Sequence, residues 1–89
     1  MKRFQADAAL WHNIQEMHED LKRTMHFPDY YGCNLDALHD MLTECRDTEL
    51  TVLHTSALYQ ALGDRANTVL QVLTDSSQEN EGFSVRFRF

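Results

Sequence analysis

The sequence predicts a two-layer α/β domain, in which a three-stranded parallel sheet carries about four helices on one face. Three short segments have strand character, and helical segments separate them; strands joined through helices generally run parallel. The last segment, residues 83–89, alternates apolar and polar side chains, which indicates one buried face and one solvent-facing face. Without repeats or linkers, residues 1–89 are expected to form a single domain.

The first strand is expected at residues 2–5, and the first helix begins after Asn13. Asn13 and Glu16 have the spacing of a capping box, in which each side chain satisfies a free backbone N–H of the first turn. The apolar residues that follow recur at helical spacing and are Ile14, Met17, Leu21 and Met25. The helix should end before Pro28, because the residue preceding a proline disfavours helical angles.

The second helix is expected at residues 35–43, with Asn34 as its N-cap. Its apolar face consists of Leu35, Leu38, Met41 and Leu42. The segment "LTVLHT", residues 50–55, is apolar and rich in β-branched side chains, so it is predicted to be a buried strand.

Two more helices and a strand complete the chain. Ser56 is expected to open a short helix that runs through Leu62, and Asp64 to cap a longer one that ends by Gly82. The core stripe predicted for the longer helix is Val69, Leu70, Val72 and Leu73. In the final strand the predicted buried side chains are Phe83, Val85, Phe87 and Phe89. The predicted solvent-facing side chains are Ser84, Arg86 and Arg88.

The acidic residues are concentrated in one part of the chain. The formal net charge is −6 at pH 7, and residues 29–49 hold six acids against a single base, Arg46. A nucleic-acid-binding protein needs the opposite, a basic surface that displaces counterions from phosphate. The sequence therefore argues against direct nucleic-acid binding and indicates a cationic partner.

The two cysteines, Cys33 and Cys45, are expected to be free thiols. A helix between them would hold them roughly 15 Å apart or more, whereas the Cα atoms of a disulfide lie within about 7 Å of each other. The chain also shows no secretory signal and no apolar run long enough to cross a membrane. These features predict a cytoplasmic protein without a membrane segment.

One motif extends across the second predicted helix and the loop before it. The segment "FPDYYGCNLDALHDML", residues 27–42, resembles the signature of the barstar family, intracellular inhibitors of secreted microbial ribonucleases. The segment "VLQV", residues 69–72, and the order of elements along essentially the whole chain are also similar. The resemblance implies that the second helix and the preceding loop enter the active site of a basic, barnase-type ribonuclease in a one-to-one complex.

The resemblance also implies which residues contact the partner. Carried over by the motif, they are Tyr30, Gly32, Asn34, Asp36 and Asp40. Asp75 falls where the family tends to place a glutamate. Three residues depart from the family pattern: Cys33 replaces a more usual charged residue, His39 a tryptophan, and Cys45 a large aromatic. Cys33 and His39 lie within the motif and are retained as predicted partner-binding residues.

The spacing of Asp36 and Asp40 supports this interpretation, because residues four apart on a helix share one face. We expect Asp40 to replace an RNA phosphate and Asp36 to act as an outer partner. Tyr30 would stack on a catalytic side chain, and Gly32 would let the loop backbone approach closely. Between Tyr30 and Tyr31, Tyr30 is expected to be the exposed one. Inhibition of this kind requires no cofactor and no metal.

Several alternatives stay open at this point. The alternatives to a barnase-type ribonuclease inhibitor are an immunity protein for a different toxic nuclease, an acidic regulatory interaction module, and an enzyme that uses Cys33 or the cluster of Asp36, His39 and Asp40. The same cluster has workable spacing for metal ligands but lacks a further ligand. Asp75 and Glu79 form a second acidic pair, which either faces solvent or contacts the partner.

Overall fold

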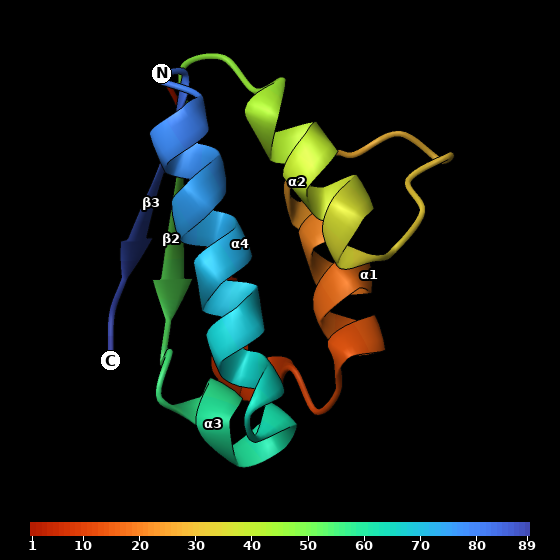
Figure 1. Ribbon diagram of the computed structural model, residues 1–89, viewed down its shortest axis with the longest axis vertical. Helices are drawn as coiled ribbons and strands as arrows, with labels where there is room; N and C mark the ends of the chain where they lie inside the picture. The colour runs from red at the N-terminus through yellow and green to blue at the C-terminus, as the bar shows by residue number, and fades with distance from the viewer.

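The computed structural model describes residues 1–89. Its elements are β1 (Lys2–Asp7), a 3₁₀ helix η1 (Ala8–Leu10), α1 (Ile14–Thr24), α2 (Leu35–Thr43), β2 (Thr48–Leu53), α3 (Ala57–Leu62), α4 (Arg65–Glu79) and β3 (Phe83–Phe87). The strands form one sheet in the order β1-β2-β3, and both pairs are parallel. Figure 1 shows the helices on one side of this sheet. The predicted two-layer α/β fold is confirmed.

The helices form a layer in which α1 contacts β1 and α4 contacts β3, while α2 packs beside α4. Between this layer and the sheet lies one apolar core, which includes Met17 and Leu21 of α1, Leu38 of α2 and Leu73 of α4. Trp11 also belongs to it, with 1% of its surface exposed. None of the helices is both long and apolar enough to cross a bilayer.

The strands differ from the predicted bounds at their ends. β1 continues to Asp7 because its pairing with β2 extends through Asp7 and Leu53. β2 is shifted two residues toward the N-terminus, since the left-handed angle of His54 (φ 55°) turns the chain at its end. β3 stops at Phe87, whose partner is Val52. The prediction that Phe89 is buried is wrong: it lies beyond the paired residues and is 70% exposed.

The polar residues of the predicted last strand, residues 83–89, behave as predicted. Ser84, Arg86 and Arg88 are all exposed, so this side of the strand faces solvent. Arg86 is paired there with Glu49 of β2, at 3.4 Å between Nε and Oε2.

Two of the four predicted caps are present as side-chain hydrogen bonds. Asn13 accepts a bond from the Glu16 amide at 2.8 Å, although Glu16 in return accepts from the amide of His12 rather than that of Asn13. Ser56 and Asp64 precede their helices but make no cap bond, because their own backbone angles are already helical. The Asn34 cap is described with the site.

The buried stripe of α4 differs from the predicted one. Its fully buried residues are Ala66, Val69, Leu73 and Ser76. Leu70 and Val72 are only partly buried and pack against the edge of the core. The true stripe keeps a strict spacing of three and four residues, and it includes small side chains that a search for large apolar residues passes over.

Candidate partner-binding site

The loop before α2 is fixed to the core by one of its two tyrosines. Tyr31 is 5% exposed, and its hydroxyl lies 2.7 Å from Nδ1 of the buried His18 on α1. Its ring also packs on Phe27, with ring centroids 4.9 Å apart. Tyr30, the neighbouring residue, is 81% exposed, as predicted. The loop therefore presents Tyr30 from a rigid base.

Burial of this anchor has electrostatic consequences. Desolvation lowers the pKa of His18 below its usual value, so its imidazole is neutral in the fold near pH 7. Desolvation also raises the pKa of Tyr31, which keeps its hydroxyl protonated. The Tyr31–His18 contact is thus a hydrogen bond between two neutral groups.

The end of the loop is shaped by Gly32, Cys33 and Asn34. Asn34 caps α2 by accepting a hydrogen bond from the Ala37 amide at 2.7 Å. Cys33 adopts a left-handed backbone angle (φ 52°) and is half-buried, and its thiol is free. Gly32 is exposed, so its backbone is open to a partner. The cap fixes the first turn of α2 relative to the loop.

Asp36 and Asp40 lie one turn apart on α2, and both are exposed. The ion pairs of the two arginines involved in such contacts, Arg23 with Asp20 and Arg86 with Glu49, lie elsewhere. The ion-pair contact of Asp40 is with His39, at 4.0 Å. The two carboxylates are therefore not neutralised by any Lys or Arg of the chain.

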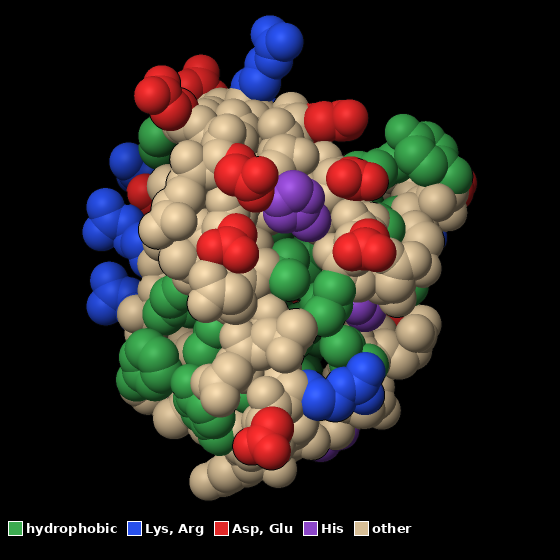
Figure 2. All heavy atoms as spheres, viewed as in Figure 1, with side chains coloured by type: hydrophobic (Ala, Val, Ile, Leu, Met, Phe, Trp, Pro, Cys, Tyr) green, Lys and Arg blue, Asp and Glu red, His purple; other side chains and the backbone are tan.

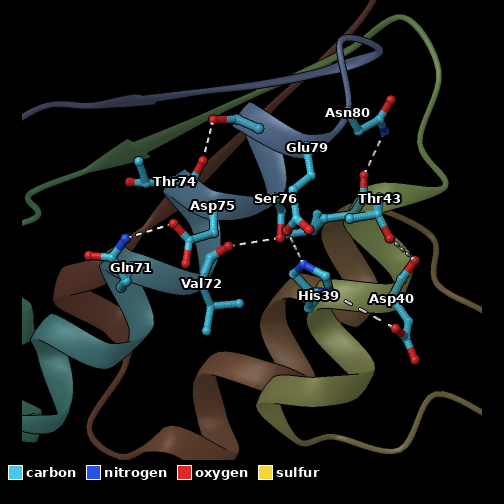
Figure 3. A network of polar contacts seen from close by, with 12 residues as sticks. His39, Asp40, Thr43, Gln71, Val72, Thr74, Asp75, Ser76, Glu79 and Asn80 are labelled. Atoms are coloured by element: carbon cyan, nitrogen blue, oxygen red, sulfur yellow. Dashed lines mark hydrogen bonds and ion pairs between the residues drawn. The ribbon is translucent and has the colours of Figure 1, made fainter.

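His39 joins α2 to α4. Its Nε2 lies 2.5 Å from Oε2 of Glu79, forty positions away in the sequence. Figure 3 shows the imidazole between the Glu79 and Asp40 side chains. The hydrogen bond with Glu79 raises the pKa of His39, and the negative charges of Glu79, Asp40 and Asp75 raise it further, against some desolvation.

Asp75 and Glu79 bring α4 into the same surface. Asp75 accepts a hydrogen bond from the Gln71 side chain at 2.7 Å and lies close enough to act on the charge of His39. Figure 2 shows acidic side chains gathered around a histidine on the face formed by α2 and α4. We call this surface, with Asp36, His39, Asp40, Asp75 and Glu79, the acidic face.

Glu79 is a residue that the sequence prediction did not place in the site. The sequence feature that pointed to Glu79 was its spacing of four residues from Asp75, but this spacing also fits an ordinary solvent-facing side of a helix. The contact with His39 depends on how α2 packs on α4, and that is a property of the fold.

The C-terminal ends of α2 and α4 are tied together by Asn80. Its side-chain amide donates to the carbonyl oxygens of Leu42 and Cys45, at 2.9 and 2.8 Å. The Leu42 carbonyl also accepts from the Cys45 amide, at 3.3 Å, so Asn80 adds a second donor at this end of α2. Asn80 thereby fixes the separation of the two helices that carry the acidic face.

The acidic face is not arranged for metal binding. No group of three or more His, Cys, Asp or Glu side chains in the structure is placed so that it could hold a metal ion. The arrangement instead offers exposed carboxylates and one exposed tyrosine on a rigid base, which suits contact with a cationic surface.

The three parallel strands, the single layer of helices and the acidic α2 define a barstar-like α/β domain. The barstar family, described as barstar (barnase inhibitor), matches the chain over residues 1–89. A protein of Bacillus subtilis (strain 168) named "Putative ribonuclease inhibitor YrdF" is 40% identical over 81 residues, which is 89% of this chain and 89% of that protein. The chain belongs to the barstar family.

Proposed function

We propose that this protein inhibits a ribonuclease by covering the enzyme's active site with α2 and the loop before it. The observation that carries the proposal is that Asp36 and Asp40 are exposed together and have no Lys or Arg partner in the chain. The description of the family as barnase inhibitor and the name of the Bacillus relative support the same function.

The mechanism follows from what a ribonuclease active site must contain. An enzyme that binds RNA phosphate presents cationic side chains, and a guanidinium forms paired hydrogen bonds with a carboxylate as readily as with a phosphate. Asp40 replaces the phosphate in this pocket, and Asp36 contacts a cation at its edge. Inhibition of this kind is steric and electrostatic, and the protein is a binding protein rather than an enzyme.

The loop contributes shape to the same contact. Tyr30 is exposed and held by the buried Tyr31, so its ring can stack on a catalytic side chain without a large loss of conformational freedom. The exposed Gly32 lets the partner approach the backbone beside it. Asn34 and Cys33 complete the loop edge of the contact, and Asp75 extends it onto α4.

The charge of the whole protein favours fast encounter with such a partner. A net charge of −6 creates a field that attracts a basic enzyme and orients the acidic face toward it. We expect a one-to-one complex, no direct binding of nucleic acid, and action in the cytoplasm, where the inhibitor protects its producer.

The identity of the nuclease is set by the residues that depart from the family motif. Cys33 and His39 lie in the loop and on the acidic face, where a partner would touch them. This placement favours an immunity protein for a nuclease whose surface differs from that of barnase, as a variant of the same function.

Competitive kinetics test the proposed mechanism. With a small, basic, guanyl-preferring microbial ribonuclease, the apparent dissociation constant of the inhibitor is expected to rise with the concentration of an RNA oligonucleotide, because RNA and inhibitor compete for one site. Asp40→Ala should weaken inhibition by at least about thirtyfold, since it truncates one partner of a buried charge pair. Glu19→Gln is the matched control, because Glu19 is exposed on α1 outside the acidic face.

Two results would overturn this mechanism. An apparent dissociation constant that stays the same at every RNA concentration would show that the inhibitor does not occupy the phosphate site. Equal losses for Asp40→Ala and Glu19→Gln would show that the net charge matters and the position of Asp40 does not.

A further inference from the structure

His39 is a titratable base on a surface whose other charged groups are carboxylates. Its side chain is 36% exposed, and its Nδ1 and Nε2 face Asp40 at 4.0 Å and Glu79 at 2.5 Å. The charged groups that act on it are Asp40 from α2 and Asp75 and Glu79 from α4. When protonated, His39 therefore neutralises part of the surface that a cationic partner would need.

The surroundings of His39 favour its protonated form. The ordinary pKa of histidine is about 6.5, and the hydrogen bond with Glu79, together with the neighbouring carboxylates, raises the pKa of His39 above it. Histidine is the side chain whose charge ordinarily changes near neutral pH, so His39 gives the acidic face a pH-dependent charge.

We propose that His39 is a specificity-determining residue, an internal cation that competes with the partner's Arg and Lys side chains for the carboxylates of α2 and α4. This inference rests on the proposed function, since it concerns how the same face selects its partner. A partner with permanent cations binds tightest when His39 has lost its proton. Where free His39 is protonated, binding releases a proton from it.

Proton linkage gives the direction in which the affinity for the partner changes with pH. A partner cation placed among the same carboxylates repels the imidazolium and lowers its proton affinity. Bound protein then holds fewer protons than free protein, so affinity rises with pH until free His39 is deprotonated. A partner that offers a histidine in place of Arg or Lys loses its own charge as the pH rises, so its affinity does not increase with pH.

Two variants at one position, compared with the unmodified protein, isolate this effect. His39→Lys keeps a cation at every pH, and His39→Gln removes it at every pH. Their affinities, with those of the unmodified protein, are measured by calorimetry at pH 5.5 and pH 8.0 for two probes, a hexa-arginine peptide and the basic ribonuclease. His12→Gln is the control, because His12 pairs with Glu16 at 2.8 Å away from the acidic face.

The unmodified protein is expected to bind hexa-arginine roughly threefold to tenfold more tightly at the higher pH. His39→Gln should bind tightly and His39→Lys weakly at both pH values, and His12→Gln should behave as the unmodified protein. Calorimetry in buffers of different ionisation enthalpy should count a released proton that is absent for His39→Gln.

The two probes separate this inference from the proposed function. If hexa-arginine shows the pattern and the ribonuclease is not bound, the role of His39 stands and the nuclease assignment fails. If the ribonuclease is bound equally by all four proteins at both pH values, binding of the ribonuclease stands and the competition by His39 is refuted.

Discussion

The hydroxyl of Tyr31 lies 2.7 Å from Nδ1 of His18, and this contact anchors the loop that presents Tyr30. Both partners are almost fully buried, with 5% and 1% of their surfaces exposed. The binding surface is therefore coupled to the core at one defined point, and changes at that point should affect stability before they affect binding chemistry.

Tyr31→Phe removes the hydroxyl and leaves a buried imidazole nitrogen without its partner. An unsatisfied buried polar group costs about 1–3 kcal/mol, so urea denaturation should show a loss of stability of that size. Tyr30→Phe is the control, and because Tyr30 is exposed it should change stability by less than about 0.5 kcal/mol. Similar values for the two variants would show that the His18 contact contributes little.

The pKa values of the two histidines of the site region should be shifted in opposite directions. Burial lowers the pKa of His18, while the carboxylates of the acidic face raise the pKa of His39. Imidazole proton shifts followed by NMR should show His39 gaining its proton at a higher pH than His18. In Glu79→Gln the pKa of His39 should fall, since its first hydrogen-bond partner loses its charge, and that of His18 should not move.

Acid should weaken the fold through His18. Below about pH 6.5 an unfolded histidine takes up a proton, whereas buried His18 stays neutral until its lowered pKa is reached. The unfolded state then binds more protons, so stability falls as the pH drops through this value. His39, whose pKa is raised, contributes in the opposite sense, and its contribution is lost at high pH. Urea denaturation of His39→Gln at pH 7.5 and 5.5 should therefore show a larger acid loss than the unmodified protein.

Gly32→Ala separates folding from binding. A Cβ at this position would lie 3.2 Å from Nδ2 of Asn34, a side-chain atom that can shift, so stability should change by less than about 1 kcal/mol. Affinity for the ribonuclease should fall by about tenfold or more, because the methyl group holds the partner away from the loop.

The matched substitution is Gly82→Ala. Its Cβ would lie 2.6 Å from the backbone oxygen of Cys45, and overpacking of this kind costs about 1–3 kcal/mol. It should lower stability without a specific effect on binding. A destabilised Gly32→Ala with unchanged affinity would remove Gly32 from the contact.

The sequence was sufficient where structure depends on neighbours along the chain. The Asn34 cap, the exposure of Tyr30 and the shared turn of Asp36 and Asp40 follow from local spacing, and the structure confirms them. The fold class followed from the alternation of strands and helices.

What the sequence did not predict depends on tertiary packing. The contact of His39 with Glu79 exists because α2 lies on α4, and the Asn80 bridge depends on the same packing. The caps predicted at Ser56 and Asp64 do not form. Both residues are of a capping type, but their backbone angles are helical, which the residue type alone does not reveal. Whether Cys33 touches a partner is still a prediction.

The most direct test of the central claim is a titration of this protein into a fixed amount of a small, basic, guanyl-preferring ribonuclease while RNA cleavage is followed. We predict that activity falls linearly to zero at one equivalent, and that Asp40→Ala loses this sharp end point while Glu19→Gln keeps it. Full ribonuclease activity in the presence of several equivalents of the folded protein would contradict inhibition of this class of enzyme.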